Sequence, residues 1–188
     1  MRRRMIAAIR HGIEAFRAWR NARADARHEG RLPWSHKRRI RQARRVLDRI
    51  APWVAAGDGA KVFAYLRKVD PLVFEELVLE CLSRSGLRIR RGTRYSGDGG
   101  VDGHVWVDGR LCPIQCKRYR NTIDPKHVAA FVDQALHSHA PVAFFIHTGR
   151  TGDLSREAAR GAPVVMVSGS RLLRLLAGVP PLTRKENQ

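Results

Sequence analysis

The dipeptide Asp108-Gly109 constrains the fold of this chain more than any other feature of its sequence. It separates two runs, 101–107 and 110–119, in which β-branched, aromatic and other apolar residues recur. Asp-Gly between such runs is a strong signal for a β-hairpin with a two-residue turn. A turn of that length also fixes which residues of the two strands face each other.

The register set by this turn brings polar side chains together. Asp102 should face Gln115 across the hairpin, with their Cβ atoms about 5 Å apart. Lys117 lies two residues beyond Gln115, so it shares the same face of the strand. Ile114 and Cys116 point to the opposite face, as residues of a hydrophobic core should. Asp102, Gln115 and Lys117 are therefore expected to converge.

A carboxylate, an amide and an ammonium group in one place suit the hydrolysis of phosphodiesters. Hard cations such as Mg²⁺ prefer oxygen ligands, which Asp102, Gln115 and the backbone carbonyl of Cys116 can supply. A bound cation lowers the pKa of a water ligand and neutralises charge on the phosphate. An adjacent lysine such as Lys117 can orient or polarise the attacking water. The alternative is a surface hairpin with three ordinary polar residues.

The rest of the chain alternates helical and strand patterns, which predicts an α/β fold with a mixed central sheet flanked by helices. Asp70 is a good N-cap and Pro71 suits the first helical turn, so a helix should begin there and end near Gly86. Further helices are expected over 125–137, 154–160 and 170–176, and further strands over 87–91, 142–147 and 164–167.

The chain has a formal net charge of +19 and a pI near 11.4, which points to a polyanionic partner such as nucleic acid. Residues 1–70 hold 19 of the 36 Lys and Arg residues but only 6 of the 17 Asp and Glu residues. Apolar residues at helical spacing predict one helix over 4–27 and a second after the loop 32–35. These two helices would form a basic N-terminal hairpin. The inward residues of the second helix are Ile40, Ala43, Leu47 and Ile50.

The outward face of that second helix is a candidate DNA-binding surface. It carries Arg38, Arg41, Arg45 and Arg49, and we interpret the hairpin as a clamp on the DNA backbone. A solvated basic surface and a protein-docking hairpin are the alternatives. Three more basic residues, which either track phosphates or form a solvated edge, follow the second strand of the β-hairpin: Arg118, Arg120 and Lys126.

The cysteines and the N-terminus indicate the compartment. Cys81, Cys112 and Cys116 are expected to be reduced thiols. Four steps along a strand separate Cys112 from Cys116 by about 13 Å, which is too far for a shared zinc ion. Arg10 and Glu14 interrupt the apolar core that a signal peptide would need, and no stretch is long enough to span a membrane. We therefore expect a cytoplasmic protein with no membrane partner.

Four motifs occur in a fixed order along the chain. They are Phe74-Glu75-Glu76-Leu77-Val78, then Gly86, then Ser96-Gly97-Asp98-Gly99-Gly100-Val101-Asp102-Gly103, and then Ile114-Gln115-Cys116-Lys117-Arg118-Tyr119. This series resembles the catalytic domain of the Mrr family of restriction endonucleases, which belongs to the PD-(D/E)xK nuclease superfamily. The resemblance spans about residues 66 to 178 and implies a restriction-endonuclease-like core.

The resemblance also implies roles for individual residues. Asp102 matches the metal-binding acid, Gln115 a position that is Glu in many relatives, and Lys117 the catalytic lysine. Glu75 matches a helix carboxylate that assists the metal site, with Glu76 as the alternative. The expected cofactor is Mg²⁺ or Mn²⁺. A glutamine at position 115 gives the metal site one charge fewer, which should weaken it.

The expected organisation is a basic helical extension over 1–58, an Mrr-like nuclease domain over 59–180 and a C-terminal tail over 181–188. Pro52 and the Gly-Asp-Gly run after it mark residues 51–60 as the linker. Asp98 is expected to shape the Gly-rich loop through hydrogen bonds to backbone amides.

The predicted function is Mg²⁺-dependent hydrolysis of DNA by an endonuclease of the restriction-enzyme type. Two alternatives stay open, namely a catalytically weak or inactive nuclease-fold DNA-binding protein and a basic adaptor for RNA or protein. A single metal site in each chain would require a homodimer to cut both DNA strands at once.

Overall fold

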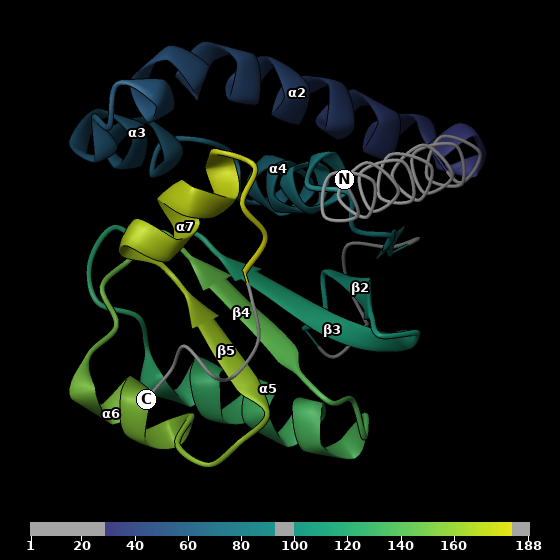
Figure 1. Ribbon diagram of the computed structural model, residues 1–188, viewed down its shortest axis with the longest axis vertical. Coiled ribbons are helices and arrows are strands. Elements are labelled where there is room, and N and C mark those ends of the chain that lie inside the picture. Colours follow the sequence, from purple (N-terminus) through teal and green to yellow (C-terminus); the bar gives the residue numbers. More distant parts are fainter. Residues whose placement is uncertain (1–28, 93–99, 182–188) are drawn as a thin grey trace, which may run out of the picture.

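Figure 1 shows a computed structural model of the chain, which describes residues 29–92 and 100–181. A five-stranded sheet in the order β1-β2-β3-β4-β5 lies at its centre. The first three strands are antiparallel and the last three are parallel, so the expected mixed sheet is confirmed. The strands are β1 (Ile89–Arg91), β2 (Gly103–Val107), β3 (Arg110–Lys117), β4 (Ala143–His147) and β5 (Val164–Val167).

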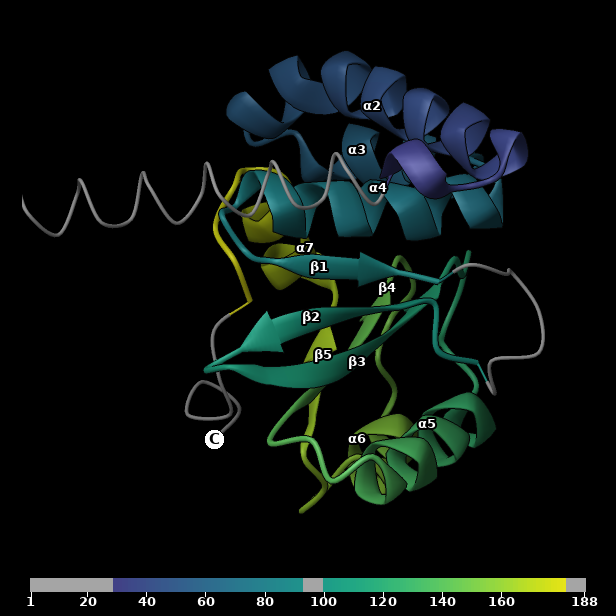
Figure 2. The same cartoon turned by 90° about the vertical axis from the view of Figure 1, so that its right-hand side faces the viewer.

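Helices cover both faces of this sheet, as Figures 1 and 2 show. One face carries α4 (Pro71–Arg84), with α7 (Gly169–Leu176) beside it. Outside α4 lies a further layer made of α2 (Trp34–Ala55) and α3 (Gly59–Leu66). The other face carries α5 (Pro125–His137) and α6 (Asp153–Ala158). The flanked α/β class expected from the sequence is therefore confirmed.

The β2–β3 hairpin has the turn and register that the sequence predicts. Asp108 and Gly109 have φ angles of 47° and 77°, and a two-residue hairpin turn of type I′ requires such positive values at both positions. The ladder pairs Val107 with Arg110 and continues to Gly103 opposite Ile114. Both strands are shorter than expected, because β2 begins at residue 103 rather than 101 and β3 ends at residue 117 rather than 119.

The ladder ends where a side chain replaces the backbone as hydrogen-bond partner. The backbone N–H of Asp102 still donates to the carbonyl of Ile114 at 2.9 Å. The next donor on β3, the N–H of Cys116, bonds the carboxylate of Asp102 at 2.6 Å instead of a backbone carbonyl. This exchange draws the Asp102 side chain onto the end of β3.

Residues of β3 alternate between the two faces of the sheet, and only one of these faces places β3 residues in a hydrophobic core. Ile114 and Cys116 belong to the larger core, with α4 and with Phe144 and Ile146 of β4. Phe145 belongs to the smaller core under α5. Gln115 and Lys117 therefore lie on the α5 side of the sheet, since side chains alternate along a strand.

Helix α4 begins as the sequence predicts. The side chain of Asp70 accepts hydrogen bonds from the N–H groups of Leu72 and Val73 at 2.9 and 3.2 Å, and Pro71 is the first helical residue. The helix ends at Arg84, two residues before Gly86. Strand β2 passes very close to it, because a Cβ atom at Gly103 would lie 2.8 Å from Leu79.

The expected linker over residues 51–60 is wrong. Helix α2 continues through Pro52 to Ala55, and α3, which the sequence analysis missed, begins at Gly59. Gly57 has a φ of 70° and allows the sharp turn between the helices, and the side chain of Asp58 caps α3 by accepting from the N–H of Lys61 at 3.0 Å. The residues that suggested a linker instead form a tight helix-to-helix turn.

Helix α2 belongs to the main core of the molecule. Leu47 and Ile50 lie in the same hydrophobic cluster as the residues of α4 and the sheet, and Ile40 is fully buried. The helix lies parallel to α4, since Arg44 reaches Glu80 and Asp48 reaches Arg84. The expected partner helix over 4–27 falls outside the described residues.

The other elements differ little from the expectations. α5 and β5 have the predicted bounds, β1 begins two residues later, and the ends of β4, α6 and α7 shift by one or two residues. Element ends depend on local hydrogen bonds that periodicity does not resolve. Within residues 29–92 and 100–181, none of the helices has the length and apolar character needed to cross a membrane.

Candidate active site

The four residues expected to carry the chemistry come from three elements that meet at one end of the sheet. Asp102 directly precedes β2, Gln115 and Lys117 lie at the end of β3, and Glu75 lies in the second turn of α4. The charge of Asp102 raises the pKa of Glu75, and the charge of Lys117 lowers the pKa of both acids. The structure therefore brings these three charges together, two from the hairpin and one from a helix.

Asp102 is half-buried and oriented by the backbone. Its Oδ2 accepts the N–H of Cys116 at 2.6 Å. Burial raises the pKa of Asp102 to about 6, although this hydrogen bond and the charge of Lys117 both lower it. The protein thus offsets the negative charge of this carboxylate only in part. A divalent cation binds well to such a carboxylate.

Glu75 is also half-buried, and its pKa is raised more than that of Asp102. Burial and, after it, the nearby charge of Asp102 raise the pKa of Glu75 to about 8, and the charge of Lys117 opposes this shift. Buried carboxyl groups with raised pKa values are a recurrent feature of metal and catalytic sites.

Gln115 contributes a buried amide oxygen to the site. Its Nε2 donates to the carbonyl of Gly100 at 2.5 Å. Its Oε1 is buried and has no hydrogen-bond partner within the described ranges. Leaving a buried polar atom unsatisfied costs about 1–3 kcal/mol. This oxygen is therefore the atom of the site that most requires a ligand.

A close backbone approach holds the Gln115 amide in place. Gly100 has a φ of 94°, and a Cβ atom at this position would lie 2.6 Å from Nε2 of Gln115. A larger residue at position 100 would displace the amide. Asp98, expected to shape this loop, lies outside the described residues.

Lys117 lies beside a histidine that the sequence analysis did not assign to the site. In the parallel pairing of β3 with β4, Lys117 is opposite His147. Burial lowers the pKa of His147 to about 4, so the imidazole is neutral at physiological pH. Its Nε2 lies 3.1 Å from the hydroxyl of Thr151. The sequence contains no signal for this neighbour, because nothing local fixes the register of parallel strands.

Cys116 separates the two polar residues of β3. Its side chain is buried in the core on the α4 side, and its N–H bonds Asp102. Its carbonyl, the expected backbone ligand, lies between Gln115 and Lys117 at the same end of the strand.

Glu76, the alternative to Glu75, has a different environment. Its Oε2 accepts from Nε of the buried Arg91 at 2.9 Å, and its Oε1 lies 3.7 Å from Nδ1 of His36. Glu76 is thus committed to an internal ion pair, and Glu75 is the carboxylate that faces Asp102.

Among the residues that the structure describes, no three His, Cys, Asp or Glu side chains are grouped to hold a metal ion. The expected ligands here are two carboxylates, an amide oxygen and a backbone carbonyl, so only two of them belong to those four residue types. The set suits a hard, oxygen-binding cation rather than zinc.

The basic residues expected to bind DNA have different environments. Arg38, Arg41, Arg45 and Arg49 are all exposed on α2, on the face opposite the buried residues that pack towards α4. Arg120 and Lys126 are exposed near the start of α5.

Arg118 is engaged within the protein. Its Nη1 donates to the carbonyl of Arg67 at 2.5 Å, and Arg67 in turn donates to the carbonyl of Thr148. This chain of contacts ties the end of β3 to the segment that precedes α4.

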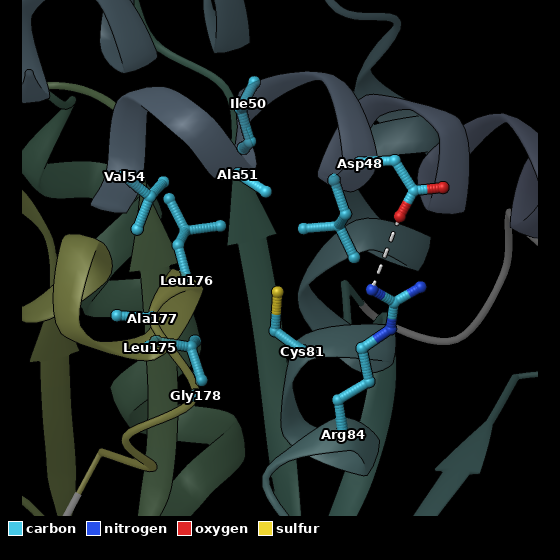
Figure 3. A pocket seen from close by; sticks show the side chains of 11 residues that line it. Asp48, Ile50, Ala51, Val54, Cys81, Arg84, Leu175, Leu176, Ala177 and Gly178 are labelled. Carbon is cyan, nitrogen blue, oxygen red and sulfur yellow. Dashed lines mark ion pairs between the residues drawn. The ribbon is translucent and has the colours of Figure 1, made fainter. Parts of the chain in front are cut away.

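A separate pocket of about 270 Å³ lies between α2, α4 and α7 (Figure 3). Its lining is mainly apolar, and the Asp48–Arg84 ion pair of 3.8 Å lies at its edge. Arg84 is nine residues from Glu75, or about 14 Å along α4. The pocket is therefore distinct from the polar site. The apolar residues that line it include Leu47, Ile50, Val54, Cys81, Leu175 and Leu176.

A comparison with protein families identifies the family of this chain. The family model for the Mrr catalytic domain, described as a restriction endonuclease, matches residues 66–176. This match spans more than half of the chain and includes Glu75, Asp102, Gln115 and Lys117. It begins after α2.

One solved structure is also similar, "MspJI Restriction Endonuclease in Complex with 27-mer Oligonucleotide", with 23% sequence identity and a TM-score of 0.44. The match covers 64% of this chain and 30% of that chain, so this chain spans less than a third of that protein's length. A search of curated proteins finds no match.

Proposed function

Because the chain belongs to the restriction endonuclease family, a family of nucleases, we propose that it is a metal-dependent DNA endonuclease with Glu75, Asp102, Gln115 and Lys117 at its reaction centre. One observation carries the proposal. Two carboxyl groups with raised pKa values face each other at the end of the sheet, beside a buried amide oxygen that lacks a partner within the described residues.

The donor set fits a hard divalent cation such as Mg²⁺ or Mn²⁺. Asp102, Glu75, Oε1 of Gln115 and the carbonyl of Cys116 would hold it. Such a cation, when bound, lowers the pKa of a coordinated water and offsets negative charge on the phosphate. The Gln115 oxygen supports this assignment, because a cation would supply the partner that this atom lacks among the described residues.

The chain's own residues would orient the reactants. The N–H of Cys116 holds the Asp102 carboxylate at the end of β3. The Gly100 carbonyl holds the Gln115 amide by its nitrogen, which leaves the oxygen as the acceptor that points to a ligand.

Lys117 would supply the positive charge of the reaction. Its ammonium group would orient the attacking water or offset charge on the phosphate as the transition state forms. His147 beside it is neutral because burial lowers its pKa. Because the His147 imidazole is neutral, it places no like charge opposite Lys117.

The proposed substrate is DNA. The net charge of +19 favours a polyanion, and contacts to phosphates give affinity that falls steeply with salt. The exposed arginines of α2, together with Arg120 and Lys126, are proposed phosphate contacts. Arg118 is proposed to act near the site by tying β3 to the segment before α4.

Supercoiled plasmid tests the proposal directly. The purified chain should nick or linearise it with Mg²⁺ or Mn²⁺ and not with EDTA. Asp102→Asn and Lys117→Met should each lower the cleavage rate about 1,000-fold or more, which corresponds to about 4 kcal/mol. Both variants should keep their affinity for DNA within severalfold of the parent.

The control is Asp153→Asn, which removes an exposed carboxylate from α6 and should cut like the parent. Cleavage by Asp102→Asn at the parental rate would show that the site lies elsewhere. Steeply salt-dependent binding without cleavage under any divalent ion would favour an inactive nuclease-fold DNA-binding protein. Direct linearisation, without a nicked intermediate, would indicate that two chains act together.

A further inference from the structure

The sheet has one region that α5 does not cover. The smaller core beneath α5 contains Phe145 of β4 and Val164 of β5. Among the described residues, this core has no member from β1 or β2. The α5-side face of those two strands therefore extends past the helix, at the β1 edge of the sheet.

Strand β1 and the residue before it present two arginines on this open face. Ile89 and Arg91 are buried towards α4, whereas Arg88 and Arg90 on either side of Ile89 are exposed. This alternation is that of a strand with one face on the core. It directs two permanent positive charges away from the core.

The neighbouring strand β2 adds a histidine and a tryptophan to the same face. Arg90 is paired with His104. The guanidinium of Arg88 lies 4.8 Å from the centre of the Trp106 ring, and the N–H of Trp106 donates to the carbonyl of Arg88 at 2.8 Å. Both aromatic side chains are half-buried, so the arginines form the outermost layer.

This surface is continuous with the proposed reaction centre. Positions 102, 104 and 106 share one face, and successive members of such a row are about 6.8 Å apart. The row therefore begins at Asp102 and leads to His104 and Trp106. None of the strands β1, β2 and β3 contains an acidic residue.

We propose that the open face of β1 and β2, with Arg88 and Arg90 as its cationic groups, binds the DNA backbone next to the phosphate that is cleaved. This inference rests on the proposed nuclease function, because the row points to DNA only if Asp102 acts on a phosphodiester. Charge complementarity favours this ligand, since a strand edge with two arginines and no acid attracts phosphates. The exposed arginines of α2 point away from α4. The cations next to the row formed by positions 102, 104 and 106 are therefore Arg88 and Arg90.

The test measures duplex binding by fluorescence anisotropy across a range of salt concentrations, in Ca²⁺. The double variant Arg88→Gln/Arg90→Gln should bind about tenfold or more weakly. Its slope of log affinity against log salt should be shallower by about 1.8, because each lost phosphate contact removes about 0.9. Arg88→Lys/Arg90→Lys, which keeps the charge, should recover most of the slope.

The matched control is Arg156→Gln/Arg160→Gln, which removes the same charge from exposed positions in and just after α6 and should leave the slope close to that of the parent. Thermal unfolding of each variant shows whether loss of the Arg88–Trp106 contact disturbs the fold. A parental salt slope in a folded Arg88→Gln/Arg90→Gln variant overturns the inference.

Binding and cleavage fail separately in this design. If the parent cuts plasmid and the Arg88/Arg90 variant binds like the parent, the surface inference is wrong and the nuclease proposal stands. If nothing cuts but the slope falls as expected, the surface binds DNA and the nuclease proposal is wrong. In plasmid cleavage the variant should raise KM much more than it lowers kcat.

Discussion

Glu75 and Glu76 are adjacent on α4, yet they have opposite environments. Glu76 faces the buried Arg91 at 2.9 Å, whereas Glu75 faces Asp102 and Lys117 at the end of the sheet. Burial and, after it, the charge of Asp102 raise the pKa of Glu75 to about 8. One step along the helix therefore separates a carboxylate that the fold neutralises from one that it leaves unsatisfied.

Glu80, one turn further along α4, extends the neutralised side. It contacts Arg44 and Arg84 through Oε1 and Arg91 through Oε2. Burial alone would raise the pKa of Glu80, but the hydrogen bonds and charges of these arginines hold it below its ordinary value. Burial of an acid therefore does not by itself identify a site. A candidate site is indicated by a buried acid whose pKa stays raised, as that of Glu75 does.

The largest expected effect comes from replacing Arg91, the buried cation that contacts Glu76 and Glu80. Arg91→Met leaves both Glu76 and Glu80 without the buried guanidinium that they share, and breaking such a pair costs about 3–5 kcal/mol. We expect thermal unfolding about 10 °C or more below the parent. Arg156→Met, which breaks an exposed pair with Asp153, is the control and should change stability by less than about 1 kcal/mol. Equal stability of Arg91→Met and the parent would remove the contrast between the two acids.

The second effect concerns Glu75, the acid of α4 whose pKa is raised. Glu75→Gln should lower metal-dependent cleavage about 100-fold, or about 2.7 kcal/mol in the barrier, because it removes a proposed ligand charge. It should leave thermal stability at pH 8 equal to the parent or slightly higher, because a neutral amide avoids the repulsion from Asp102. Cleavage assays and melting curves on the same preparation check both statements. A destabilised Glu75→Gln that cuts normally would assign Glu75 to the fold instead.

The smallest effect is a pH dependence of stability without metal. The pKa values of Glu75 and Asp102 are raised to about 8 and about 6, so the folded state binds protons more tightly than the unfolded state. Stability should therefore fall as pH rises from about 4 to 8. Allowing for partial exposure, we expect about 1 kcal/mol, or roughly 2–4 °C.

Mg²⁺ should reverse this trend, because it binds the deprotonated carboxylates, and its stabilising effect should grow with pH. The Glu75→Gln/Asp102→Asn double variant should lose both effects. Differential scanning calorimetry from pH 5 to 8.5, with and without Mg²⁺, measures them. A double variant that keeps the full pH dependence would place its origin outside this pair.

Much of the fold could be predicted because its strongest signals are local. The Asp108-Gly109 turn fixed the hairpin register, and the Asp70 cap fixed the start of α4. The linker prediction failed for a physical reason, since the proline and glycines near residue 55 also suit a tight turn between two helices. Only the packing of α2 on α4 distinguishes these outcomes.

The sequence predicted the candidate site only in part. The turn alone predicted that Asp102, Gln115 and Lys117 lie at one end of a hairpin, because the register of a hairpin does not depend on other elements. It did not predict that Asp102 would bond the backbone of Cys116, nor that Gln115 would be fixed by Gly100. Its choice of Glu75 over Glu76 came from family resemblance, since both acids occupy the same turn of the same helix.

The sequence by itself determined the hairpin, its register and the excess of positive charge, because a two-residue turn and a count of ionisable groups involve no distant contacts. Tertiary structure alone decided which acid of α4 meets Asp102, which acids meet arginines, and which strand lies beside Lys117. Those relations join segments tens of residues apart. They are set by how the helices and the sheet pack into shared cores, where each buried charge is satisfied or left unsatisfied by residues that no local pattern reveals.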